Sequence, residues 1–263
     1  MISESIRFVK AEANGNDFVI VDAAAVAPEA RSGFARRICD RHRGVGADGV
    51  EFVTSHDSHV DLDLVNADGS QAEVSGNGTR CVAAFYARHG FRKGKLHTGG
   101  GVLEAKVMNE GPEWEIEIGF PAPRLEGEMK LEALGREWPV YTLSMGNPQC
   151  VLRVDEFAAD WQALGAALEA HSHFPHRTNV EFVRVAGPGA LEIRIFERGV
   201  GPTESSGTGS SAAAVAAMAQ GWVASPVVVR SPGGVQRVAW RGAGTEVYLT
   251  GPARIVAEGL FLP

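Results

Sequence analysis

Two short segments decide how this chain is organised: Glu73-Val-Ser75-Gly76-Asn77-Gly78-Thr79 and Glu204-Ser-Ser206-Gly207-Thr208-Gly209-Ser210. Both fit the pattern Glu-x-Ser-Gly-x-Gly-(Ser or Thr), and the second follows the first by 131 residues (73 to 204). Serine is a favoured residue immediately before a helix, and small residues follow each segment. We therefore predict that each segment opens a buried helix, over Gly76 to His89 and Gly207 to Gln220.

The same offset relates the sequence on both sides of these segments. Matching pieces occur in the same order, within two residues of one offset. They are Gly15-Asn16 with Gly146-Asn147, the strand-like Phe18 to Val21 with Cys150 to Val154, the helix-like Pro28 to His42 with Asp160 to His173, Val50-Glu51-Phe52-Val53 with Val180-Glu181-Phe182-Val183, Asp61 to Val65 with Glu192 to Phe196, and Gly99 to Val102 with Pro232 to Val235. Such order indicates a duplicated architecture.

The duplication predicts the fold class. We expect an α/β (α+β) protein with two pseudo-symmetric halves, each a barrel-like mixed sheet around a central helix. The N-terminal half comprises residues 1–119 plus 253–263, because the last strand-like segment, Ile255 to Phe261, is expected to return to it. The C-terminal half comprises residues 120–252.

Composition excludes several classes of protein. The 263 residues are 44% hydrophobic and carry a net charge of −7, which argues against broad binding to nucleic acid or acidic membranes. No apolar run is long enough to span a membrane, and the N-terminus lacks the apolar stretch of a secretory signal. The three widely spaced cysteines predict no disulfide framework and fit a cytoplasmic protein. They are Cys39, Cys81 and Cys150.

Each Ser-Gly-x-Gly segment has two interpretations. The unpaired backbone N–H groups and the dipole at a helix start bind carboxylate or phosphate. Serine and glycine are also common there for capping and turning alone. The duplication favours a ligand, because two equivalent helix starts would converge on a cleft between the halves, where small molecules usually bind.

Two classes of cofactor site have partial matches in the sequence, and neither match is complete. Gly44-Val-Gly46-Ala-Asp-Gly49 matches a dinucleotide-binding pattern, but it follows a helix-like segment where that motif requires a strand. His171, His173 and His176 lie near one another around Pro175, but without the spacing of a metal site. We expect no metal and no cofactor.

Taken together, these residues resemble the diaminopimelate epimerase family nearly from end to end. The segments that carry the resemblance are Gly15-Asn-Asp-Phe-Val19, Gly44 to Gly49, Asn66-Ala-Asp-Gly-Ser70, Ser75-Gly-Asn-Gly-Thr-Arg-Cys81, Met145-Gly-Asn-Pro148, Phe174-Pro175, Thr178-Asn-Val-Glu-Phe182, Glu197-Arg-Gly-Val-Gly201, Ser206-Gly-Thr-Gly209 and Thr250-Gly-Pro-Ala253. The resemblance implies two pseudo-symmetric halves with an amino-acid substrate between them. It also implies a homodimer in lysine biosynthesis that needs neither metal nor pyridoxal phosphate.

The resemblance also implies a two-base mechanism and a set of site residues. In the family, two cysteines on opposite faces of the substrate α-carbon remove and deliver a proton. The corresponding positions here are Ser75 and Ser206. The implied substrate-binding residues are Asn16, Gly76, Asn77, Glu197, Gly207 and Thr208 around the proximal amino-acid group, and Asn66, Asn147, Asn179 and Arg198 around the distal centre.

The departures from the family pattern fall on the chemistry. Both acid–base positions hold serine, and the family's histidine after Asn-Pro is Gln149. A serine hydroxyl is a far weaker acid than a thiol, whose pKa is about 8.5, so it is a poor base for an α-carbon. None of the three cysteines stands where it could substitute.

Three interpretations stay open. The chain is an amino-acid epimerase or racemase in which serines hold the two positions; it is a non-catalytic relative that binds a diaminopimelate-like amino acid; or it carries engineered Cys-to-Ser substitutions. Gln149 and the unusual Ala11-Glu-Ala13 speak against the third, because engineering two cysteines would leave both unexplained.

Overall fold

The computed structural model describes residues 5–109, 111 and 113–262, which fold as two compact units. Unit 1 comprises Met1–Ile118 and Gly251–Pro263, and unit 2 comprises Gly119–Thr250. The chain passes from one unit to the other within two strands, β8 (Trp114–Phe120) and β17 (Val247–Phe261). In the part of the chain that the structure describes, no helix has the length and apolar character that crossing a membrane requires.

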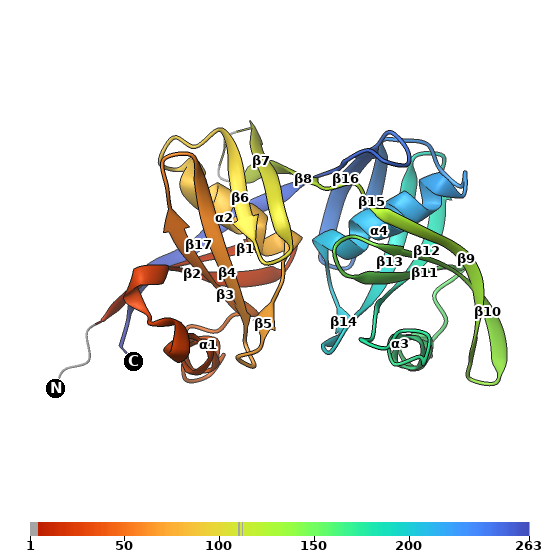
Figure 1. The fold of residues 1–263 in the computed structure, drawn as a ribbon, viewed down its shortest axis with the longest axis horizontal. Helices are drawn as coiled ribbons and strands as arrows, with labels where there is room; N and C mark the ends of the chain where they lie inside the picture. The colour runs from red at the N-terminus through yellow and green to blue at the C-terminus, as the bar shows by residue number, and fades with distance from the viewer. Residues whose placement is uncertain (1–4, 110, 112, 263) are drawn as a thin grey trace. The chain divides into compact units, whose positions relative to one another are not determined.

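Unit 1 is a mixed sheet whose strands pair in the order β8–β17–β1–β2–β3–β4–β6–β7, with β5 added to β4 (Figure 1). The β2–β3 and β4–β6 pairs are parallel, and the other registered pairs are antiparallel. The elements are β1 (Ile6–Ala13), β2 (Asn16–Asp22), the 3-10 turns Ala23–Ala25 and Pro28–Ala30, α1 (Arg31–Ile38), β3 (Gly49–Ser55), β4 (His59–Asn66), β5 (Gln71–Ala72), α2 (Gly76–Ala87), β6 (Lys93–Thr98) and β7 (Gly101–Asn109).

Unit 2 repeats this topology in the order β9–β10–β11–β12–β13–β15–β16–β17, with β14 added to β13. Its β11–β12 and β13–β15 pairs are parallel, at the positions equivalent to the parallel pairs of unit 1. The elements are β9 (Arg124–Ala133), β10 (Arg136–Ser144), β11 (Pro148–Arg153), α3 (Trp161–Glu169), β12 (Asn179–Gly187), β13 (Ala190–Glu197), β14 (Gly201–Thr203), α4 (Gly207–Ala219), β15 (Val227–Ser231) and β16 (Gly234–Trp240). The predicted fold class is confirmed.

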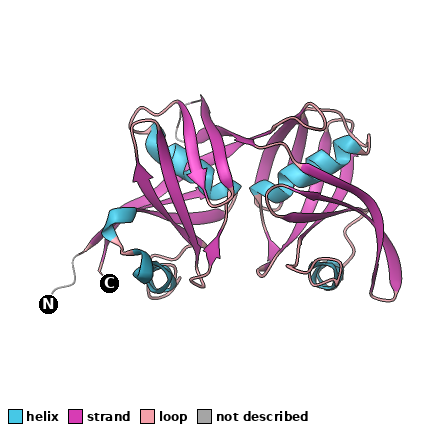
Figure 2. Cartoon of the chain, in the orientation of Figure 1, coloured by secondary structure: helices cyan, strands magenta, loops and turns pink. Residues whose placement is uncertain are grey.

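Each unit wraps its sheet around one buried helix (Figure 2). Helix α2 packs against β1, β2 and β7, and α4 packs against six strands of its own unit. Every residue of α4 from Gly207 to Ala217 is buried. Small side chains make this possible, because a helix surrounded by strands on most sides leaves little volume for each residue.

Two helices are shorter than the sequence predicts. The segment Pro28 to His42 forms a 3-10 turn followed by α1, which ends at Ile38. There the chain folds back, and the N–H groups of Val45 and Gly46 both donate to the Ile38 carbonyl, at 2.8 and 3.0 Å. Gly46 has φ 76°, a conformation that glycine adopts readily, so the glycines here terminate a helix. Helix α3 likewise occupies only Trp161–Glu169 of the predicted Asp160 to His173.

The final strand belongs to both sheets. Its first part pairs with β16, where Leu249 lies opposite Val238, and its last part pairs with β1, where Gly259 lies opposite Phe8. Residues 255–261 therefore pair with the first strand of the chain.

Candidate active site

Ser75 and Ser206 occupy equivalent positions, each at the N-cap of its unit's central helix. Ser75 Oγ accepts a hydrogen bond from the Gly78 N–H at 3.0 Å, and Ser206 Oγ accepts one from the Gly209 N–H at 3.2 Å. Both residues have extended backbone angles, as N-cap residues do. The capping bond uses an oxygen lone pair and leaves the hydroxyl proton able to point elsewhere.

In unit 1 a buried arginine fixes the first turn of α2. Arg80 is fully buried, and its guanidinium donates to Asn77 Oδ1 at 2.8 Å and to Asn14 Oδ1 at 2.9 Å. Its Nε donates to the Pro252 carbonyl at 3.2 Å. Because Asn77 Oδ1 accepts from an arginine, its amide nitrogen must face the other way, toward Asn16.

The amide network continues to the β1–β2 turn. Asn77 Nδ2 donates to Asn16 Oδ1 at 3.2 Å, and Asn16 Nδ2 donates to Asp48 Oδ2 at 2.6 Å. Arg41 then joins the carboxylates of Asp48 and Asp17, at 2.7 and 2.9 Å. The structure therefore brings together Asn16, Gly76 and Asn77, with both asparagine side chains oriented by charged neighbours.

Asn66 lies at the end of β4, opposite Gly49 of β3 and beside the same loop. Its neighbour Ala67 donates its N–H to the Asp48 carbonyl at 3.0 Å. The Asn66 side chain donates to Ser70 Oγ at 3.0 Å, within the turn that follows the strand. Asp48 thus lies between the turn that carries Asn16 and the strand end that carries Asn66.

In unit 2 a second asparagine organises the strand ends near α4. Asn179 is 5% exposed; its Oδ1 accepts the Arg198 N–H at 2.9 Å, and its Nδ2 donates to the Pro148 carbonyl at 3.4 Å. Glu197 ends β13 immediately before Arg198. Asn179, Glu197 and Arg198 are thereby held at one end of the β11–β12–β13 sheet, while Gly207 and Thr208 form the buried first turn of α4.

Gln149 stands at the position where the resemblance implies a histidine. It is fully buried, and its Nε2 donates to Asn147 Oδ1 at 2.6 Å. Its Oε1 has no hydrogen-bond partner among the described residues. A carboxamide neither gains nor loses a proton to form a charged state near neutral pH, so Gln149 can orient Asn147 but cannot act as an acid or base as an imidazole does.

The structure also shows a pair of buried carboxyl groups that the sequence analysis did not assign to the site. Glu51 on β3 and Glu181 on β12 are equivalent residues of the two units, and both are buried. A methyl group added to Gly78 would overlap Glu51 Oε1, and one added to Gly209 would lie 3.1 Å from Glu181 Oε1. Each carboxyl therefore rests against the first turn of the central helix, beside the N-cap serine.

Both glutamates have strongly perturbed acidity. Burial, reinforced by the charge of Asp63, raises the pKa of Glu51 to about 8. Burial, reinforced by Glu197, raises the pKa of Glu181 well above its usual range. Glu51 Oε2 and both carboxyl oxygens of Glu181 find no hydrogen-bond partner among the described residues. The sequence contains these glutamates in the repeated segment Val-Glu-Phe-Val. That repeat does not indicate which face of the strand the glutamate occupies.

The three cysteines are structural. Cys39, Cys81 and Cys150 are free and buried. Burial raises the pKa of Cys39 to about 12 and raises the pKa of Cys81 and Cys150 above the ordinary range. Cys81 lies within α2 and Cys150 within β11, so neither thiol replaces the missing acid–base group.

The histidines around Pro175 lie in the turns after α3. There the His173 N–H donates to His171 Nδ1 at 3.1 Å, and the His173 ring contacts Phe174 edge-on. A different group, His56, His59 and Asp61 in unit 1, brings its potential ligand atoms within 4.8 Å of one another.

Comparison with known proteins supplies the family. The family model described as diaminopimelate epimerase matches residues 8–122 and 141–256. Proteins named diaminopimelate epimerase from Ectopseudomonas mendocina and Desulforudis audaxviator are 38% and 39% identical, and each alignment covers 97% of this chain and 98% of the relative.

Solved structures with the same fold are more distant in sequence. A hydroxyproline epimerase from Agrobacterium vitis has a TM-score of 0.76 at 15% identity, covering 99% of this chain and 92% of that one. A protein of the phenazine biosynthesis PhzF family from Bacillus anthracis has a TM-score of 0.73 at 17% identity, covering 99% and 100%. At these identities the likeness shows the fold, whereas the relatives that are more similar in sequence support an epimerase or racemase. The chain belongs to the diaminopimelate epimerase family of isomerases.

Proposed function

We propose that this protein binds a zwitterionic amino acid of the diaminopimelate type and inverts its α-carbon without metal or pyridoxal phosphate. The observation that carries the proposal is the duplicated N-cap. In each unit a serine stands at the start of a buried helix, in a family whose members invert an α-carbon, with oriented amide groups beside it. The alternative function is binding of such an amino acid without catalysis.

Binding is supported by the groups at the two helix starts. Unpaired backbone N–H groups at a helix N-terminus stabilise a carboxylate. The N-terminal turns of α2 and α4 are rich in glycine, which has no side chain to shield those groups. Asn77 is oriented by Arg80, Asn16 by Asp48, and Asn179 by the Arg198 N–H. Glu197 adds a carboxylate at the end of β13. The proposed binding residues are Asn16, Asn66, Gly76, Asn77, Asn147, Asn179, Glu197, Arg198, Gly207 and Thr208.

Inversion requires a proton acceptor and a proton donor on opposite faces of one carbon. The proposal assigns these positions to Ser75 and Ser206. One serine, after losing its hydroxyl proton to solvent, accepts the α-proton as an alkoxide and becomes a hydroxyl. The other serine donates its hydroxyl proton to the opposite face of the carbon and is left as the alkoxide. Because a serine hydroxyl is a poor base, and because Gln149 cannot relay a proton, we expect slow turnover. The resemblance adds a homodimer and a role in lysine biosynthesis to the proposal, and the cysteine pattern adds a cytoplasmic location. Light scattering on the purified protein tests the homodimer.

The test follows the α-proton directly. The protein is incubated with LL- and meso-diaminopimelate in D2O, α-deuteration is followed by NMR, and binding is measured by calorimetry. Deuteration above the rate of the Ser75→Ala/Ser206→Ala variant supports inversion. Binding without deuteration supports the non-catalytic alternative, and absence of binding across a panel of amino acids refutes both.

A second double variant tests whether only the acid–base pair limits the site. In Ser75→Cys/Ser206→Cys we expect deuteration to rise by at least about 100-fold, because a thiol at a helix N-terminus ionises near neutral pH. Unchanged exchange, with binding intact, would show that the remaining shell does not support the reaction.

A further inference from the structure

Three histidines and one aspartate of unit 1 lie close together at the β3–β4 turn and on β4 and β6. We call His56, His59, Asp61 and His97 the His–Asp cluster. His59 and Asp61 are two residues apart on β4, so their side chains point to the same face. His97 on β6 lies directly opposite Asp61 in the parallel β4–β6 register. His56 precedes β4 in the turn from β3, where its N–H donates to the His59 carbonyl at 2.9 Å.

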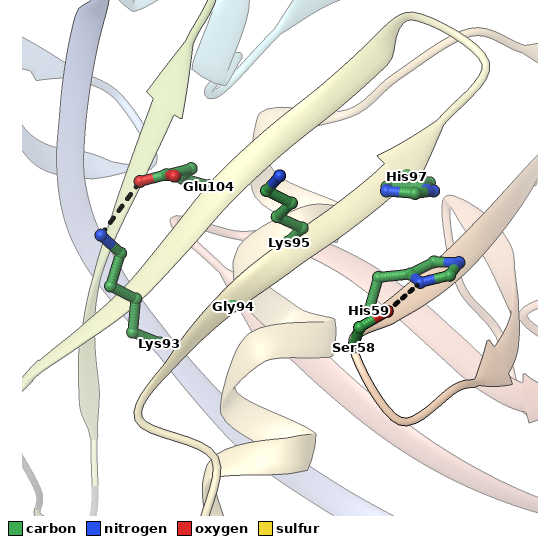
Figure 3. A pocket seen from close by; sticks show the side chains of 7 residues that line it. All are labelled: Ser58, His59, Lys93, Gly94, Lys95, His97 and Glu104. Atoms are coloured by element: carbon green, nitrogen blue, oxygen red, sulfur yellow. Dashed lines mark hydrogen bonds and ion pairs between the residues drawn. The ribbon is translucent and has the colours of Figure 1, made fainter.

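All three imidazoles turn a ring nitrogen toward the Asp61 carboxylate. The Asp61 oxygens lie 2.9 Å from His56 Nε2, 3.3 Å from His59 Nε2 and 3.3 Å from His97 Nδ1. The rings are stacked, with centroids 4.4 Å apart for His56 and His59 and 4.0 Å apart for His59 and His97 (Figure 3 shows the latter pair).

A hydroxyl group orients the middle histidine. Ser58 Oγ lies 3.0 Å from His59 Nδ1 (Figure 3). When Nδ1 carries the proton and donates it to Ser58, the lone pair of Nε2 faces Asp61 and is available to a cation. Such an outer hydrogen bond to the second ring nitrogen is the usual support of a metal-binding histidine.

We propose that the His–Asp cluster binds a divalent transition-metal ion, with zinc as the best fit. The ligand atoms of His56, His59 and Asp61 lie within 4.8 Å of one another. Two imidazole nitrogens and one carboxylate oxygen form a donor set that Zn²⁺ accepts, with a water molecule or His97 as the fourth ligand. With metal–ligand bonds of about 2.0–2.1 Å, a tetrahedral ion separates its ligand atoms by about 3.3 Å. Two of the three nitrogen–oxygen distances already have that value. Binding would draw the ligand atoms of His56, His59 and Asp61 together from their present separations of up to 4.8 Å.

The surroundings allow a metal to enter. Side chains of the cluster are between one quarter and one half exposed, so solvent reaches them. The cluster borders an open hollow of about 650 Å³ whose lining includes His59, Lys95 and His97 (Figure 3). A bound ion would cross-link the β3–β4 turn, β4 and β6, and would therefore stabilise unit 1.

Lys95 opposes binding and supplies a sensitive control. It lies opposite His59 in the β4–β6 register, two residues from His97 on the same face. Its positive charge near the cluster disfavours a cation. Lys95→Gln should therefore tighten zinc binding. If the histidines only form ion pairs with Asp61, the protein binds no zinc and the substitution has no affinity to change.

The experiment titrates the full-length protein with Zn²⁺ by calorimetry at pH 7.5 and with Co²⁺ by visible absorption. We expect one Zn²⁺ per chain, and intense cobalt bands near 500–700 nm that indicate tetrahedral coordination. Because binding stabilises the folded state, zinc at 100 times its Kd should raise the Tm by about 5 °C. The three buried cysteines are not expected to compete.

Four variants localise the site. His59→Asn and Asp61→Asn should each weaken zinc binding by more than about 10-fold, and His173→Asn in unit 2 should leave it unchanged. Ser58→Ala, which removes an exposed hydroxyl and preserves the fold, should weaken it by a smaller factor. Absence of zinc binding at 100 µM in the unsubstituted protein, or equal affinity in it and in the His59 and Asp61 variants, would overturn the proposal.

Discussion

The pKa of Glu51 makes a quantitative prediction about stability. In the folded protein this pKa is about 8, against an ordinary value of 4.5. Below pH 4.5 the carboxyl is protonated in both the folded and the unfolded state and contributes no pH dependence. Between pH 4.5 and 8 the unfolded chain ionises while the folded protein stays protonated, so the unfolded state gains stability. Stability that is present at low pH is therefore lost as the pH rises.

The size of the loss follows from linkage. Each pH unit in that window changes the free energy of unfolding by about 1.4 kcal/mol. With these two pKa values the loss between pH 5 and pH 8 is about 3.5 kcal/mol. Glu51→Gln has no titrating group and should not show it. The amide introduced by Glu51→Gln also changes the free energy of unfolding by a constant amount, through its own unsatisfied atoms. The test therefore compares how the free energy of unfolding depends on pH, and not its value at one pH.

The assay is urea unfolding at pH 5, 6, 7 and 8, followed by fluorescence and circular dichroism. The free energy of unfolding of the unsubstituted protein should fall relative to that of Glu51→Gln as the pH rises, by about 3.5 kcal/mol between pH 5 and pH 8. Glu181→Gln should flatten the profile in the same direction, and the exposed Glu29→Gln serves as the matched control. Parallel profiles for the unsubstituted protein and Glu51→Gln would show that the carboxyl is ionised in the fold and refute the reasoning.

Two further substitutions examine the same helix start. Gly78→Ala should destabilise unit 1 by about 2 kcal/mol, although alanine normally favours a helix, because its methyl group would overlap Glu51 Oε1. Thermal unfolding measures the loss. If Gly78→Ala is equally destabilising in a Glu51→Ala background, the overlap with Glu51 is not the cause. Arg80→Met should lower the free energy of unfolding by about 3 kcal/mol, because it removes the hydrogen bonds that Arg80 donates to Asn77 Oδ1 and Asn14 Oδ1. It should also weaken amino-acid binding. An unchanged affinity in calorimetry would show that the orientation of Asn77 does not depend on Arg80.

Features that depend only on residues adjacent in the sequence were predicted correctly. Ser75 and Ser206 were predicted to open helices, and they do, because a cap needs only the next three residues. The repeat also predicted that the two units share one order of elements. The end of α1 was missed, because it depends on the chain folding back from Val45 and Gly46 onto the Ile38 carbonyl.

Contacts set by strand register were beyond prediction from the sequence. His97 meets Asp61 only because β6 pairs in parallel with β4 after the intervening helix. The strand containing Glu51 is buried on both faces, so alternation could not reveal that its carboxyl lies against Gly78. Arg80 likewise reaches the Pro252 carbonyl, 172 residues away in sequence. The contacts of Glu51 and Arg80 distinguish the first turn of α2 from a generic helix start.

The capping bonds separate two reasons why serine stands at positions 75 and 206. Sulfur is a weaker acceptor than oxygen, so Ser75→Cys should lose about as much cap stability as Ser75→Ala, on the order of 1 kcal/mol. The two variants differ in acidity, however, because the helix N-terminus lowers the pKa of a thiol and an alanine has none. Comparing them at equal stability therefore isolates the proton-transfer chemistry from the capping. If the serines serve only the helix, neither variant changes exchange; if they occupy the acid–base positions, cysteine raises it and alanine abolishes it.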